Sequence, residues 1–192
     1  MNDTVAVYDR MVDDYVALAD DLPSTLPSFL KALKPGARVL DLGCGPGHHA
    51  EVIAGLGHDV LAVDASAEMI KHAGARKGVR VRQATFDDIP DLGEFDAVWA
   101  SFALLHARRA DVPRHIAQIE GICAPGAIFS LTLKVGEGEA TDSLGRFYSY
   151  FSRAELESYL EEAGFTVGRV ETGAVMGMAG HEEPWIGIEA HG

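Results

Sequence analysis

A short stretch rich in glycine, residues 41–47 (DLGCGPG), is the part of this sequence whose residue types and spacing best suit chemistry. A glycine backbone can turn sharply and approach a ligand with no Cβ in the way. The stretch joins an apolar segment to a helical pattern, so it leads into a helix N-terminus whose free N–H groups point at a ligand. We therefore expect Gly43, Cys44, Gly45 and Gly47 to form a binding loop, with the small Cys44 filling the turn rather than acting as a nucleophile.

Two acidic residues flank this loop. Asp41 precedes Gly43 by two residues, and Asp64 ends the next apolar segment, 21 residues beyond Gly43. An acid at the position of Asp64 in a β-α-β crevice accepts hydrogen bonds from ribose hydroxyls. The third glycine of a dinucleotide fingerprint would fall at position 48, where this chain has His48. The spacing and the Asp41 carboxylate therefore favour a cofactor that carries an amino group and a sulfonium over a nicotinamide dinucleotide.

The elements that must position these residues alternate between strand and helix patterns. Apolar runs predict strands at Arg38–Leu42, Asp59–Val63, Val79–Ala84, Phe95–Ala100, Ala127–Leu133, Phe165–Val170 and Trp185–Ala190. Helical patterns occupy most of the intervals between them, which predicts an α/β fold: a Rossmann-like parallel sheet of about seven strands with helices on both faces. Residues 171–184 read as a loop rich in Gly and Met, so we expect the final strand to be antiparallel.

The chain reads as a single domain, because no repeat, low-complexity segment or linker divides it. We expect an N-terminal helical cap over residues 1–34, built from one helix at Val5–Leu22, with Thr4 as its N-cap, and a short one at Leu26–Leu33. A cofactor-binding core would follow over 35–133, then a substrate loop over 134–150. The C-terminal helix and the last strands would occupy 151–192. Ser152 and Glu155 form a capping box that predicts the start of that helix.

Composition excludes several classes of protein. With 16 Lys and Arg against 29 Asp and Glu, the net charge of −13 argues against binding to nucleic acid or to an anionic membrane. Two cysteines cannot build a disulfide framework, and the adjacent His48 and His49 have no partner at ligand spacing, so no metal site is expected. The absence of a signal peptide and of a long apolar run favours a cytoplasmic protein.

The segment VLDLGCGPG, followed by AVDAS, resembles motifs I and II of the class I S-adenosylmethionine-dependent methyltransferases. The resemblance covers about residues 5–170 and implies S-adenosylmethionine as the cofactor. It implies that the motif I loop contacts the methionine part, that Asp64 binds both ribose hydroxyls, and that Ala65 and Met69 lie beside the adenine.

Two further segments are similar to motifs of the same family. QATFDDIP resembles the motif at the adenine edge, but Thr85 stands where the family has an acid. The adenine amino group would then be held by Thr85 with the backbone of Phe86, or by Asp87. FDAVWASFALLHA resembles motif IV, which implies Ala100 and Ser101 at the sulfonium.

Candidate acceptor residues come from three regions. His106 follows the motif IV strand on the ligand side of the sheet, where it is either a base or orienting donor for the substrate or a structural residue. Tyr8 and Tyr15 share one helix face and either pack in the core or cover the cofactor, as in similar enzymes. The loop at 134–150 carries charged residues that are either solvated or, as long loops often are, functional. The substrate-binding residues expected from these regions are Tyr8, Tyr15, Lys134, Arg146 and Tyr148.

The expected activity is in-line methyl transfer to a small-molecule acceptor. The small size and the 134–150 segment resemble short methyltransferases grouped with tellurite-resistance-type enzymes. A base is needed only if the acceptor is protonated at working pH, which is true of a phenol or amine but not of a thiolate. One alternative is a non-catalytic S-adenosylmethionine-binding domain, which would bind but never form S-adenosylhomocysteine. A nicotinamide oxidoreductase is a second alternative, and His48 in place of the third glycine counts against it.

Overall fold

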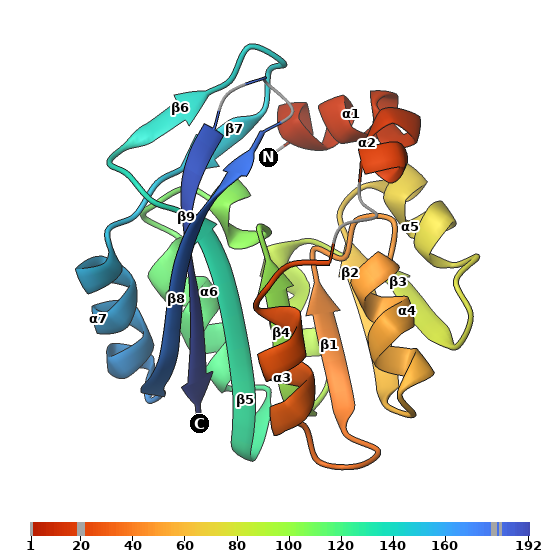
Figure 1. Cartoon of the computed structure of the whole chain (residues 1–192), viewed down its shortest axis with the longest axis vertical. Helices are drawn as coiled ribbons and strands as arrows, with labels where there is room; N and C mark the ends of the chain where they lie inside the picture. The colour runs from red at the N-terminus through yellow and green to blue at the C-terminus, as the bar shows by residue number, and fades with distance from the viewer. Residues whose placement is uncertain (1, 19–21, 178–179, 181) are drawn as a thin grey trace.

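A computed structural model describes residues 2–18, 22–177, 180 and 182–192. Its centre is a seven-stranded sheet with the strand order β3-β2-β1-β4-β5-β9-β8 (Figure 1). The strands of this sheet are β1 Arg38–Leu42, β2 Asp59–Asp64, β3 Val79–Gln83, β4 Phe95–Ser101, β5 Cys123–Lys134, β8 Thr166–Met176 and β9 Glu182–His191. The seven predicted strands are all present.

The direction of the strands also agrees with the prediction. β1, β2, β3, β4 and β5 pair in parallel. The last strand, β9, inserts between β5 and β8 and runs antiparallel to both. The parallel sheet with an antiparallel final strand is therefore confirmed.

Helices cover both faces of the sheet (Figure 1). They are α1 Asn2–Arg10, α2 Val12–Leu18, α3 Leu26–Ala32, α4 His48–Gly55, α5 Ala67–Ala73, α6 Val112–Glu120 and α7 Arg153–Ala163, with 3-10 turns η1 Phe86–Asp91 and η2 Leu104–His106. On one face, side chains of α3, α4 and α5 pack around the buried Trp99. On the other face, α6 and α7 pack around Phe129 and Phe151. No helix in the described ranges is long and apolar enough to cross a membrane.

The single helix predicted at Val5–Leu22 is wrong in two respects. The chain forms two helices, α1 and α2, interrupted at Met11, and residues 19–21 lie outside the described part. The Met11 amide is shared between the carbonyls of Val7 and Tyr8, a three-centre bond typical of helix ends. Thr4 is not an N-cap either, because α1 begins at Asn2 and the Thr4 hydroxyl accepts a hydrogen bond from the Phe147 amide.

The loop predicted over 171–184 is largely strand. β8 continues to Met176 and β9 starts at Glu182, with their pairing unbroken from Val170 onward. Gly173 lies under the Trp185 ring, and a Cβ there would come within 2.6 Å of the ring. The glycine that suggested a loop instead makes room for an aromatic side chain on the neighbouring strand.

The segment predicted as a substrate loop contains a hairpin. β6 Glu139–Thr141 pairs antiparallel with β7 Phe147–Ser149 at the same end of the sheet as α1 and α2 (Figure 1). Its two basic residues are not solvated: Arg146 is buried in an ion pair with Asp142, and Lys134 in one with Glu183, whereas Glu137 and Glu139 are exposed.

The capping box predicted at the start of α7 is present. The Ser152 hydroxyl accepts a hydrogen bond from the Glu155 amide, and the Ser152 amide donates to the Glu155 carboxylate. We expect Ser152→Ala to lower the free energy of unfolding by about 0.5–2 kcal/mol, the usual cost of losing a serine cap. Denaturant unfolding measures this change, and Ser158→Ala on the exposed side of the same helix is the control. Equal losses in the two variants would contradict the capping role.

Candidate functional site

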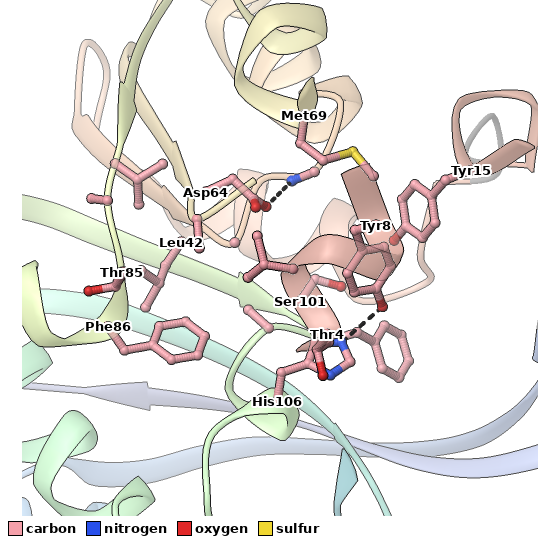
Figure 2. Close-up of a pocket in the computed structure, with 18 residues that line it drawn as sticks. Thr4, Tyr8, Tyr15, Leu42, Asp64, Met69, Thr85, Phe86, Ser101 and His106 are labelled. Atoms are coloured by element: carbon pink, nitrogen blue, oxygen red, sulfur yellow. Dashed lines mark hydrogen bonds between the residues drawn. The ribbon is translucent and has the colours of Figure 1, made fainter. Parts of the chain in front are cut away.

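A pocket of about 710 Å³, counting the solvent at its open mouth, lies at the carboxyl ends of β1, β2 and β4 (Figure 2). Strand order reverses between β1 and β4, and the crevice outside such a switch point is where open α/β sheets bind ligands. The lining comes from α1, α2 and the carboxyl ends of the four strands β1, β2, β3 and β4 with the segments that follow them: Thr4, Val5, Tyr8, Tyr15, Leu42, Gly43, Gly45, Val63, Asp64, Ala65, Met69, Ala84, Thr85, Phe86, Ser101, Phe102, Ala103 and His106.

Gly43 and Gly45 both line the pocket in a backbone conformation that favours glycine. Their φ values are +71° and +52°. The amides of Gly43 and Cys44 donate to the Val63 carbonyl at 2.8 and 2.9 Å, which ties the loop to the end of β2. A Cβ at Gly43 would lie 2.4 Å from the Ala103 Cβ, whereas one at Gly45 would meet only the Tyr15 ring, at 3.5 Å.

Two other residues of the predicted loop do not line the pocket. Gly47, at φ +82°, lies against α5, where a Cβ would come within 2.9 Å of Ala73. Cys44 is buried, its thiol donates to the Gly45 carbonyl, and burial raises the pKa of this thiol well above its usual value. Both residues therefore shape the loop from behind, and Cys44 carries a neutral thiol.

Asp64 is held in one orientation. Its Oδ2 accepts from the Gly45 amide and its Oδ1 from the Ser66 amide, both at 2.9 Å. Figure 2 shows the carboxylate directed into the pocket. Burial raises the pKa of Asp64, while these amides act in the opposite direction. A carboxylate fixed in this way retains lone pairs that can accept from a ligand's hydroxyl groups.

Asp41 is buried beneath the loop rather than in the pocket wall. It alternates along β1 with the pocket residue Leu42, so it points to the face that carries α4. Its Oδ2 has no hydrogen-bond partner within the described part of the chain. Burial, together with the charge of Asp64, raises the pKa of Asp41 to about 8. A buried carboxyl oxygen without a donor fits a nearby cationic group, as the sequence suggested.

The residues expected to bind the adenine are only partly in the positions expected from the sequence. Met69 and Ala65 line the pocket, and so do Thr85 and Phe86. The Thr85 hydroxyl donates to Asp88, and Asp87 pairs with Arg114 on the surface, outside the pocket. Of the groups expected to hold the adenine amino group, the Thr85 hydroxyl and Asp87 are therefore engaged elsewhere, and Phe86 lines the pocket.

At the other end of the pocket, Tyr8 and His106 form a coupled pair (Figure 2). His106 Nδ1 lies 2.7 Å from the Phe147 carbonyl, which can only accept, so Nδ1 carries the proton. His106 Nε2 therefore accepts, at 2.9 Å, the hydroxyl proton of Tyr8. Burial lowers the pKa of His106 to about 4, so the imidazole is neutral at physiological pH.

Three predicted substrate residues lie behind this pair and do not line the pocket. The Tyr148 ring contacts the His106 ring, with centroids 4.9 Å apart. The Lys134 Nζ lies 3.6 Å from the centre of the Tyr148 ring, and the Arg146 guanidinium lies 5.3 Å from it. The structure thus brings all five residues into one cluster. Tyr8 and His106 line the pocket, and Lys134, Arg146 and Tyr148 are buried directly behind them.

Sequence reasoning missed several lining residues. Thr4 and Val5 enter through the packing of α1, which no local pattern reports. Phe102 and Ala103 follow Ser101, whereas the predicted Ala100 is fully buried and does not reach the pocket. Phe102 has φ +53°, the one positive value of a residue other than glycine in the described chain. Such strain is typical of functional sites, but it cannot be read from the sequence.

The described residues contain no group of three His, Cys, Asp or Glu side chains that could hold a metal ion. The pocket is acidic at the loop and hydroxyl-rich at the Tyr8 end. The loop end suits a ligand that carries ribose hydroxyls and a cation.

Comparison with known proteins agrees with this geometry. Residues 39–126 match a family described as a methyltransferase domain. An uncharacterized methyltransferase of Synechocystis is 32% identical over 160 residues, which is 75% of this chain and 74% of that protein. A tRNA U34 carboxymethyltransferase of Methylococcus capsulatus is 32% identical over 152 residues, which is 70% of this chain but only 46% of that enzyme.

A solved structure shares the fold. The 1,6-didemethyltoxoflavin-N1-methyltransferase of Burkholderia thailandensis, with bound 1,6-didemethyltoxoflavin and S-adenosylhomocysteine, superposes with a TM-score of 0.74 at 24% identity, covering 97% of this chain and 87% of that one. The glycine loop, the anchored acid of β2, the sheet order and these relatives lead to one conclusion: this chain belongs to the class I S-adenosylmethionine-dependent methyltransferases.

Proposed function

We propose that this methyltransferase acts on a small-molecule acceptor, bound at the Tyr8–His106 end of the pocket. The observation that carries the proposal is the lining itself. One pocket is bounded by the cofactor loop at one end and by α1 and η2 at the other. A concave site lined mostly by apolar side chains, with a few polar groups directed into it, is typical of small-molecule binding.

The charge of the chain supports a small acceptor over a nucleic acid. No Lys or Arg is among the described residues that line the pocket, and the whole chain carries a net charge of −13. Nucleic-acid enzymes need basic surface to neutralise phosphates. Membership in the tellurite-resistance-type group and a cytoplasmic location remain predictions from the sequence.

Residues at one end of the pocket would bind the cofactor, and residues at the other end would bind the acceptor. Asp64 would hold the ribose hydroxyls and Gly43 and Gly45 the methionine part, with Met69 and Phe86 beside the adenine. Bound S-adenosylmethionine supplies an activated methyl group on a cationic sulfur. Most of the remaining catalysis can come from alignment, since a near-attack pose requires the reacting atoms about 3–3.5 Å apart. We expect Ser101, Tyr8 and His106 to align an acceptor.

A panel assay tests this function. Purified protein is incubated with S-adenosylmethionine and, separately, with thiols, selenide, tellurite, phenols, carboxylates and amines, while S-adenosylhomocysteine is quantified. We expect turnover with at least one small acceptor. Two results would contradict a small-molecule function. One is that calorimetry detects cofactor binding but no acceptor is methylated, and the other is that only tRNA is methylated. Binding without any turnover is the result expected of a non-catalytic binding domain.

Cofactor binding should depend on pH through Asp41. Its carboxyl is protonated below about pH 8 in the free protein, and a cation bound beside it favours the ionised form. Binding at pH 7 then releases a proton, so we expect the affinity to rise up to about tenfold per pH unit towards pH 8. Calorimetry at several pH values measures this slope. Asp41→Asn should abolish this dependence of affinity on pH. If the dependence persisted in the variant, the proton released on binding would come from Asp64 instead.

His106 should matter for alignment rather than as a titrating group. We expect His106→Ala to lower kcat by about 10²-fold, the effect of a misplaced reacting group, and to leave cofactor affinity within a few-fold. Because the pKa of His106 is near 4, its base form is complete above about pH 5 and the profile from pH 5 to 8 should not contain its titration. His106→Gln, which can still accept from Tyr8 and donate to Phe147, should recover part of kcat. If kcat of the wild type rose with pH around pH 6.5 and both variants lost this rise, His106 would instead be identified as a base.

A further inference from the structure

We propose that the methyl acceptor reaches this site already as an anion, and that the hydroxyl groups of Thr4 and Ser101 hold it there. The inference rests on the proposed small-molecule function and narrows its substrate class. It follows from the fixed proton of His106, from the charges behind the pocket and from the polar groups that the pocket presents.

The first observation is that the acceptor end of the pocket, around Tyr8 and His106, offers no base with an available lone pair. The carboxylate and imidazole bases among the described lining residues are Asp64 and His106. Asp64 accepts from two backbone amides and lies at the cofactor end. The accepting nitrogen of His106 already receives the Tyr8 hydroxyl proton, and the other nitrogen donates to the Phe147 carbonyl. A neutral acceptor that must lose a proton would therefore find no suitable group.

The second observation is the sign of the charge behind Tyr8 and His106. The Arg146 guanidinium lies 5.8 Å from the centre of the Tyr8 ring, and the Lys134 ammonium lies against Tyr148. Both cations are paired, with Asp142 and Glu183. Burial lowers the pKa of His106 most, and the hydrogen bond to Phe147 opposes it. Among the charged groups around His106, Arg146 and Lys134 lower this pKa and Asp142 raises it by less.

The pocket is therefore electrically polarised. The cofactor end carries Asp41 and Asp64, whose charges oppose each other's ionisation and favour a bound cation. The Tyr8 end lies in the field of Arg146 and Lys134, which favours an anion. An anionic acceptor entering at this end would meet a cationic sulfonium from the opposite side, whereas a protonated amine would be repelled by both.

The third observation is the kind of polar group at the acceptor end. Thr4 and Ser101 each bring a hydroxyl to the lining of the pocket (Figure 2). The third hydroxyl there, that of Tyr8, already donates its proton to His106. The Thr4 oxygen accepts from the Phe147 amide, so its own proton can be donated elsewhere. Hydroxyl protons rotate to suit a ligand, and hydrogen bonds from them to an anion are stronger than those to a neutral group.

The chemical step needs no proton acceptor under this inference. The acceptor's electron pair forms the new bond to the methyl carbon, and the pair of the breaking carbon–sulfur bond stays on sulfur. The anion and the sulfonium become two neutral products. No proton leaves, which agrees with a site whose imidazole is already engaged.

Binding without chemistry gives the first test. Benzoate and benzamide have similar shapes but differ in charge, and calorimetry in the presence of S-adenosylhomocysteine compares their affinities. We expect benzoate to bind at least tenfold more tightly. Ser101→Ala should reduce that preference by about tenfold or more, whereas Ser158→Ala, on the exposed side of α7 and away from the pocket, should leave it unchanged. Equal affinities, or tighter binding of benzamide, would overturn the inference.

The pH dependence of turnover gives the second test. Two acceptors are compared: the best acceptor of the panel and a ring-substituted homologue of different acidity. For each, kcat/KM should rise with pH around the pKa of that acceptor. The rising parts of the two pH profiles should therefore lie at different pH values. A rise at one common pH for both acceptors would locate the titrating group on the enzyme and overturn the inference. Absence of turnover with every small acceptor would refute the proposed function itself, while the benzoate comparison would still decide the charge preference.

Discussion

Asp64→Ala is expected to weaken the binding of S-adenosylmethionine at least tenfold while the fold survives. The carboxylate is held by the amides of Gly45 and Ser66, so it is oriented before a ligand arrives. Hydrogen bonds from two ribose hydroxyls to a charged group contribute about 1.5–3 kcal/mol each, and even one of them corresponds to more than a tenfold change. Calorimetry measures the affinity, and far-UV circular dichroism with thermal melting checks the fold.

Asp59→Ala is the matched control for this experiment. Asp59 begins the same strand but pairs with Arg80 on the surface, far along β2 from the pocket. Its loss should leave the cofactor affinity unchanged, because an exposed ion pair of this kind contributes little. Unchanged affinity in Asp64→Ala would remove the ribose assignment.

Gly45→Val is expected to abolish cofactor binding with a smaller effect on the melting temperature. Gly45 lines the pocket at φ +52°, and the only atom near a new Cβ belongs to Tyr15, at 3.5 Å. The added side chain would occupy the space of the ligand and strain the loop, since β-branched residues resist positive φ. Calorimetry and thermal melting on the same preparation separate the two effects.

Substitutions at two other glycines separate backbone strain from loss of ligand contact in Gly45→Val. Gly57→Val introduces a β-branched residue at φ +92° with no atom within 4 Å of the new Cβ, so it should lower stability without affecting binding. Gly43→Val would clash with Ala103 and should damage both. If Gly45→Val bound the cofactor as tightly as Gly57→Val does, the loop would not contact the ligand.

The sequence alone determined the cofactor end of this protein. The residues that matter there are contiguous or lie at fixed distances: Gly43, Gly45 and Asp64 follow strands whose apolar runs are plain, and backbone rules place the ends of parallel strands at one edge of the sheet. The same rules predicted the seven strands and the reversed last one. Local composition misled where glycine had a packing role, as Gly47 does against α5 and Gly173 does under Trp185.

Only the tertiary structure decided the acceptor end. Tyr8, His106 and Phe147 come from α1, η2 and β7, and their hydrogen bonds join positions up to 98 residues apart. No periodicity in the sequence reports that α1 packs over the pocket or that Arg146 and Lys134 are buried behind it. The pKa of His106 illustrates the reason: a histidine in a loop-like sequence suggests a base near neutral pH, but burial and neighbouring cations keep it neutral. Such shifts depend on desolvation and on charges brought together through space, and these exist only in the folded chain.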